Sequence, residues 1–162
     1  MSENNQKWFI TERTRAFALV HLTRRKDLAI TEEDRGVGLQ FVAYITKADG
    51  ERLLRQFGVF LRGALEPTTE QRLNKKLHST MQSLAEIGQY PYPVCLFYFT
   101  MRDDQGYYAW VAEPAVEDDQ PRLLVHSEAH CRKLDRQALD EIVAQVDRWD
   151  DAFFARIAVN TL

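Results

Sequence analysis

The segment Glu32–Gly63 decides the fold and reads EEDRGVGLQFVAYITKADGERLLRQFGVFLRG. An acidic cluster leads into Gly36-Val37-Gly38, and a strand-like run follows at Leu39–Thr46. Asp49-Gly50 is a strong signal for a hairpin turn. The second half of the return run, Arg52–Arg62, is apolar on both faces, so we expect a central strand that is covered on both sides. This hairpin has acids at its start and a base at its end, which is a pattern found in active sites.

Helices are expected on both sides of the hairpin. Apolar residues at positions i, i+3, i+4 and i+7 predict a helix over residues 11–25, with Thr11 as its N-cap. A capping box at Thr68 opens a second apolar stripe, which runs to Gly88, a residue type that favours helix ends. Both helices are amphipathic, so each should cover one face of a sheet.

Further strands are expected before and after the second helix. Leu28–Thr31 is a short extended run that precedes the hairpin. Val94–Thr100 is the most strand-like run in the chain, and a turn over residues 103–106 leads from it into Tyr107–Glu113. Arg122–His126 adds a short last strand.

A long helix is expected at the C-terminus. Asp135 is a good N-cap, and apolar residues at helical spacing follow it over residues 136–157. The acidic residues of this helix are expected to form a solvated face rather than a catalytic pair: Asp147, Asp150 and Asp151.

These elements predict one domain over residues 11–162, which follows a flexible segment over residues 1–10. The expected fold class is α/β (α+β), with a mixed β-sheet flanked by helices. The expected order of elements is α-β-β-β-α-β-β-(β)-α.

Composition and charge exclude several classes of protein. The chain of 162 residues is 45% hydrophobic and 28% charged, which is ordinary for a globular domain. Its net charge of −3 provides no global basic field for nucleic acid, although it leaves room for a local basic patch. The N-terminus lacks an apolar signal segment, and no apolar run reaches the roughly 18 residues of a membrane span. We therefore expect a cytoplasmic protein without membrane contact.

The cysteines and histidines lack metal-binding spacing. Cys95 lies in an apolar run and is expected to be a buried thiol. Cys131 follows His130 directly, but adjacent side chains rarely point at each other, which disfavours a Cys–His nucleophile. His126 and His130 are four residues apart but straddle a predicted strand end, which disfavours a zinc pair.

The hairpin and its flanks resemble the PD-(D/E)XK nuclease-like superfamily, and in particular its bacterial DUF4365 group. The matching segments are Asp34–Leu39 (DRGVGL) and Phe57–Gly63 (FGVFLRG). A later hairpin, Pro93–Thr100 followed by Tyr107–Pro114, is similar to one in that group. The resemblance covers about residues 11–157 and implies a restriction-endonuclease-like sheet.

The resemblance also implies which residues would carry nuclease chemistry. Acids or amides on the two hairpin strands of such an enzyme hold one or two Mg²⁺ ions, and a nearby lysine steadies the attacking water. In this chain the ligand positions fall on Gly38 and Phe60, which have no metal ligand, and the lysine position falls on Arg62. Arginine suits a phosphate contact but is a poor proton carrier. The resemblance is therefore to a nuclease with a degenerate site, for which no metal cofactor is expected.

Three functions follow from these observations. The expected one is a catalytically inactive nuclease-like domain that binds nucleic acid or protein through basic residues: Arg24, Arg25, Lys26, Arg62, Lys75 and Lys76. The first alternative is an active Mg²⁺-dependent nuclease with a displaced set of functional residues: Glu12, Glu33, Asp34 and Arg62. The second alternative is a protein-interaction or oligomerisation unit, which the acidic net charge and the aromatic residues of Tyr107–Trp110 favour.

Overall fold

The fold is a seven-stranded mixed sheet between two layers of helices, in a computed structural model that describes residues 2–34, 39–47 and 54–161. The strands are β1 (Leu28–Asp34), β2 (Leu39–Ile45), β3 (Gln56–Ala64), β4 (Val94–Thr100), β5 (Gln105–Glu117), β6 (Gln120–Val125) and β7 (Arg132–Lys133). The helices are α1 (Glu3–Leu22), α2 (Glu70–Lys76), α3 (His78–Glu86) and α4 (Arg136–Asn160).

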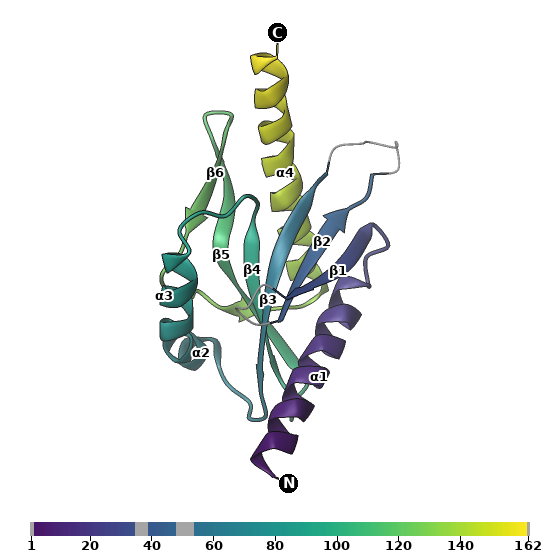
Figure 1. Ribbon diagram of the computed structural model, residues 1–162, viewed down its shortest axis with the longest axis vertical. Helices are drawn as coiled ribbons and strands as arrows, with labels where there is room; N and C mark the ends of the chain where they lie inside the picture. The colour runs from purple at the N-terminus through teal and green to yellow at the C-terminus, as the bar shows by residue number, and fades with distance from the viewer. Residues whose placement is uncertain (1, 35–38, 48–53, 162) are drawn as a thin grey trace.

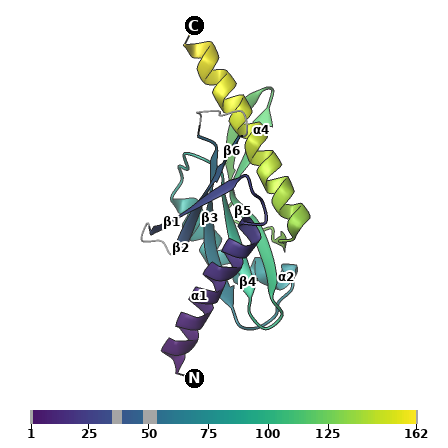
Figure 2. The same cartoon turned by 90° about the vertical axis from the view of Figure 1, so that its right-hand side faces the viewer.

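The strands lie in the order β1-β2-β3-β4-β5-β6, and β7 pairs with β5. β3 and β4 are parallel because α2 and α3 cross over between them, whereas the other neighbouring strands are antiparallel. The expected α+β class and the expected order of elements are confirmed. The two termini lie at opposite ends of the long axis (Figures 1 and 2).

Helices cover both faces of the sheet. On the face that we call the α1/α4 face, Leu22 of α1 and Ile142 of α4 belong to the same buried cluster as Val59 and Phe97 of the central strands. On the opposite face, the α2/α3 face, the buried residues of α2, α3 and the junction between them are Leu73, Leu77, Met81 and Leu84. Figure 1 shows α4 crossing the sheet and its last turns extending beyond it. None of the described helices is both long and apolar enough to cross a membrane.

β3 is buried on both sides, as its sequence predicts. Val59 and Leu61 join the cluster on the α1/α4 face, whereas Phe60 joins the cluster on the α2/α3 face. Side chains alternate between the faces of a strand, so Arg62 shares the α2/α3 face with Phe60. Gly63 returns to the α1/α4 face, where α1 lies against it. The alternation along this one strand therefore fixes which residues of the hairpin can meet.

The first helix begins earlier than the predicted range of residues 11–25. It starts at Glu3, and Ser2 rather than Thr11 is its N-cap, because the Ser2 hydroxyl accepts a hydrogen bond from a backbone N–H in the first turn. Residues 3–10 are therefore helical, and apolar side chains among them pack against the core. The helix therefore starts eight residues before the predicted residue 11.

The helix predicted from Thr68 is split in two at Leu77. Thr69, not Thr68, is the N-cap of α2, since its hydroxyl accepts a hydrogen bond of 3.2 Å from a first-turn backbone N–H. Leu77 has a ψ of 3°, which departs from the α-helical value and separates α2 from α3. The apolar pattern does not reveal the break, because Leu73, Leu77 and Met81 keep helical spacing across it and are all buried.

β4 has its predicted bounds, whereas β5 and β6 are longer than predicted. β5 extends four residues past the predicted Tyr107–Glu113, to Glu117, and pairs with β6 along that extension. The two-residue strand β7 was not expected. Two predicted features, the Gly36-Val37-Gly38 bend and the Asp49-Gly50 turn, lie outside the described residues, as does the predicted start of the return strand at Arg52.

The last helix is confirmed, but its acidic residues do not form the predicted solvated face. Asp135 caps α4, with its carboxylate accepting a hydrogen bond of 2.8 Å from the first turn. Arg55, buried just before β3, donates to Asp147 at 2.7 Å and forms an ion pair with Asp151 at 2.6 Å. Asp150 is only 3% exposed. A buried guanidinium needs such partners, and these contacts fasten α4 to the segment before β3.

The close approach of α1 to β3 predicts a specific sensitivity at Gly63. A Cβ atom at this position would overlap with the Thr14 hydroxyl, so we expect Gly63→Ala to lower the free energy of unfolding by about 1–3 kcal/mol. Thr14 is buried, and its hydroxyl lacks a hydrogen-bond partner among the described residues. Thr14→Ala should therefore cost less and should recover part of the loss in the double variant. Urea unfolding of the four proteins measures this coupling, and strictly additive changes would contradict the predicted contact.

Candidate functional site

The hairpin brings three of its residues into one row across the α2/α3 face. Glu33 of β1 is paired with Gln40 of β2, and Gln40 is paired with Phe60 of β3. Opposed residues of neighbouring strands share a face. Phe60 is 3% exposed and packs within the apolar cluster under α2 and α3. The position that the resemblance assigns to a second metal ligand is therefore filled by a buried aromatic ring.

Glu12, another acidic candidate, does not join this row. Glu12 lies on α1, where it binds Arg15 at 2.8 Å, and Arg15 also binds Glu32 of β1 at 2.9 Å. These contacts lie on the α1/α4 face, opposite to Glu33 and Arg62. Asp34 is the last residue of β1, and its side chain lies outside the described residues, as does Gly38. The structure thus separates Glu12 from Glu33 and Arg62 of the displaced set.

The described residues of the hairpin do not fit a Mg²⁺ site. Mg²⁺ is held through oxygen ligands, chiefly carboxylates, in near-octahedral geometry. On this face Glu33 is the carboxylate in the row, and its next neighbours are an amide and a phenyl ring. Among the described residues, no group of three or more His, Cys, Asp or Glu side chains is placed to hold a metal ion.

The structure brings two of the basic candidates together on the same face. Arg62 is paired with Tyr98 of β4, and the ammonium group of Lys76 lies 5.4 Å from the centre of the Tyr98 ring. Arg62 is half-buried, and burial lowers the pKa of its guanidinium, which still carries its charge at any physiological pH. One of its nitrogens donates to the carbonyl oxygen of Leu61 at 2.9 Å.

Arg62 also lines a shallow hollow of about 340 Å³ between β3 and α3, which we call the Arg62 hollow. Three hydroxyl side chains of α3 line it as well: Ser79, Thr80 and Ser83. A guanidinium beside several hydroxyl groups offers hydrogen-bond donors to an anionic oxygen. The sequence does not reveal this grouping, because the hydroxyls lie on a polar stripe that is also typical of a solvated helix face.

The basic cluster at the end of α1 is not part of that surface. Arg25 binds Asp27 at 2.7 Å and Asp140 of α4 at 2.6 Å, so its charge is balanced by two carboxylates. Arg24 and Lys26 are exposed beside it. Lys75 is exposed in the last turn of α2, next to Lys76. The six basic candidates are therefore distributed over two separate parts of the molecule.

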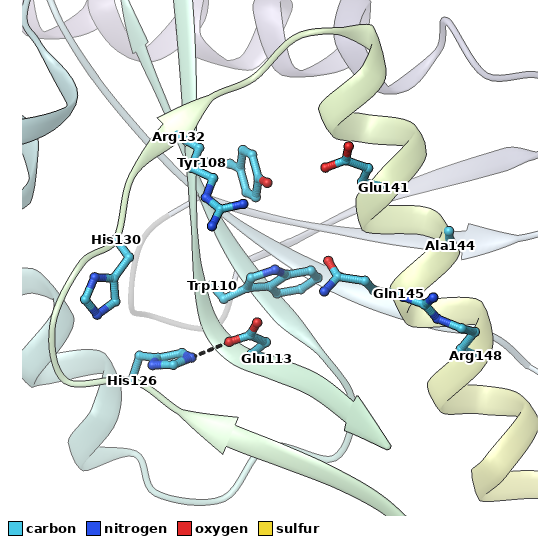
Figure 3. A pocket seen from close by; sticks show the side chains of 10 residues that line it. All are labelled: Tyr108, Trp110, Glu113, His126, His130, Arg132, Glu141, Ala144, Gln145 and Arg148. Atoms are coloured by element: carbon cyan, nitrogen blue, oxygen red, sulfur yellow. Dashed lines mark hydrogen bonds and ion pairs between the residues drawn. The ribbon is translucent and has the colours of Figure 1, made fainter. Parts of the chain in front are cut away.

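A second candidate site, not expected from the sequence, lies on the α1/α4 face between β5, β7 and α4. This α4 pocket has a volume of about 610 Å³, and Figure 3 shows the side chains that line it, among them Trp110, Glu113, His126, His130, Arg132 and Arg148. His126 binds Glu113 at 2.7 Å, and the rings of His126 and His130 are 6.0 Å apart. The sequence signal for it was weak, because these residues come from three elements and a connecting loop.

No family model matches this chain, and no curated protein or solved structure matches it either.

Both cysteines are free thiols and both are buried, which further disfavours a Cys–His nucleophile at Cys131. Burial raises the pKa of the Cys95 thiol, and burial together with the nearby charge of Glu70 raises that of Cys131 to about 12. Cys131 is in the cluster of the α2/α3 face, whereas His130 points into the α4 pocket. The neighbours in sequence thus face different parts of the molecule.

We expect both thiols to react slowly with a disulfide reagent at pH 8 in the native protein, because the thiolate is the reactive form. The same thiols should react at once in denaturant. Absorbance of the released thiolate measures both rates. Rapid, stoichiometric labelling of Cys131 in the native protein would contradict the burial described above.

Proposed function

We propose that this chain is a nuclease-like domain that has lost its catalytic function and binds the phosphate backbone of nucleic acid. The observation that carries the proposal is the contrast between Phe60 and Arg62, two residues apart on one face of β3. The metal-ligand position is apolar and buried, whereas the position of the basic residue keeps its charge. Such a pair favours anion binding without hydrolysis.

The surroundings of Arg62 support the proposal. Its hollow is lined by three hydroxyl groups, and Lys76 is close by across the ring of Tyr98. Phosphate groups of nucleic acids are bound by arginine, lysine and hydroxyl side chains in combination. Because the net charge of the chain is −3, this local group, rather than the field of the whole protein, would provide the attraction.

The resemblance to PD-(D/E)XK nucleases supports the proposal through the order of its elements. The resemblance implies a mixed sheet with a crossover helix after the hairpin, and α2 and α3 occupy that position. We further propose a cytoplasmic location, which two free, buried thiols favour because they suit a reducing compartment.

Arg62→Gln tests the nucleic-acid proposal. Fluorescence anisotropy with labelled single-stranded and double-stranded DNA and RNA at low salt should give binding that weakens with salt. We expect Arg62→Gln to weaken it about threefold to tenfold and to lower the slope of log K against log salt by about one. Lys76→Gln should act in the same direction. Arg156→Gln is the matched control, because this exposed arginine lies on α4, on the opposite side of the sheet.

Two results would count against the proposal. The first is the absence of binding to every nucleic acid at low salt. The second is equal affinity of the wild-type protein and of the Arg62→Gln and Lys76→Gln variants. Incubation of the same substrates with Mg²⁺ or Mn²⁺ checks the alternative of an active nuclease. Cleavage that disappears in Glu33→Ala or Asp34→Ala would support that alternative instead.

A second candidate function is self-association, and the exposed end of α4 favours it. Ile157 and Val159 are 48% and 72% exposed in the turns that extend past the sheet, and Phe153 is exposed nearby. A second copy of the chain that packs against these turns would cover them. Sedimentation velocity at tens of micromolar should then show a dimer that Ile157→Asp dissociates, whereas a monomeric wild-type protein would exclude this function.

A further inference from the structure

The geometry points to a second binding site, in the α4 pocket, for a small organic anion that carries a flat ring. This site is independent of the proposed nucleic-acid contact, because it lies on the α1/α4 face while Arg62 lies on the α2/α3 face. Its volume of about 610 Å³ is within the range of cavities that hold small organic ligands.

The walls of the pocket come from elements that are far apart in sequence. Trp110 and Glu113 are on β5, His126 and His130 lie in the connection between β6 and β7, and Arg148 is on α4. Figure 3 shows the indole of Trp110 between the two histidines and α4. Convergence of polar groups from several elements around an aromatic side chain is typical of ligand sites.

The charge balance of the pocket favours an anion. The ionisable groups that face it are Glu113, His126, His130, Arg132, Glu141 and Arg148, together with the phenol of Tyr108. The Glu113 carboxylate is already bound to His126 at 2.7 Å. In the part of the chain that the structure describes, Arg132 and Arg148 make no ion pair. Two guanidinium groups thus face the pocket. Of the two acids that line it, Glu113 is bound by a histidine and Glu141 is not.

The positions of the polar and aromatic side chains around the pocket narrow the class of ligand further. Arg132 reaches the pocket from β7 and Arg148 from the opposite side, on α4 (Figure 3). Guanidinium groups bind carboxylates and phosphates through paired hydrogen bonds. Trp110 is half-buried and offers an aromatic surface for a flat ring. An aromatic carboxylate and a nucleoside monophosphate both combine the two features, and they differ in the anionic group.

Calorimetric titration of the full chain tests the site with five probes. AMP and indole-3-acetate combine a ring with an anionic group, inorganic phosphate and acetate lack the ring, and adenosine lacks the charge. We expect AMP or indole-3-acetate to bind at least about tenfold more tightly than the other three probes. Which of the two binds more tightly identifies the anionic group as phosphate or carboxylate.

Substitutions assign the binding to the pocket. Arg132→Gln and Arg148→Gln change exposed side chains, so the fold should persist, and each should raise the Kd about tenfold. Arg136→Gln, an exposed arginine of the same helix that does not line the pocket, should leave the Kd unchanged. The indole N–H signal of Trp110 should shift in ¹H–¹⁵N spectra on titration, whereas that of the exposed Trp8 should not.

Three results would overturn the inference. The first is the absence of binding by both ring-bearing anions. The second is equal binding of phosphate, acetate or adenosine. The third is a Kd that stays the same in Arg132→Gln and Arg148→Gln. Because Arg62→Gln should not affect these titrations, the result is separate from that of the nucleic-acid experiment.

Discussion

The burial of β3 on both of its faces is the constraint on which the rest of the structure depends. A strand between two helical layers must alternate apolar side chains toward each layer, and Val59, Phe60 and Leu61 do so. The parallel partner β4 then requires a crossover, which α2 and α3 provide. Gly63 lets α1 approach closely on one face, and the ion pairs of Arg55 hold α4 on that same face. The two helical layers are thus both attached to β3 and the segment before it.

The same constraint decides which residues of the hairpin share a face. The alternation that puts Arg62 on the α2/α3 face also puts Phe60 there, and the apolar cluster of that face encloses the ring. A carboxylate at this position would be buried among apolar side chains, where an unpaired charge is costly. The packing of this cluster therefore disfavours a carboxylate, and with it a metal ligand, at position 60. Arg62, two positions further along the strand, lies at the edge of the cluster and lines the Arg62 hollow.

Much of the architecture was predictable from local patterns, whereas the grouping of side chains was not. Period-two and helical spacings identified the hairpin, the central strands and the capped C-terminal helix, because each signal lies within a few residues. The break at Leu77 left the helical spacing intact, so no pattern reported it. Arg55 and Asp147 meet across most of the chain, and Glu113 meets His126 across a hairpin. Such contacts depend on register and packing, which one sequence does not show.

The proposed function depends most directly on whether the hairpin binds a divalent metal ion. The most direct test is a titration of the full chain with Mn²⁺ in which electron paramagnetic resonance measures the concentration of the free ion. The account predicts that the free Mn²⁺ signal rises in proportion to the added ion up to millimolar concentration, as in buffer alone. One Mn²⁺ bound per chain at submillimolar concentration, and released by Glu33→Ala or Asp34→Ala, would contradict it.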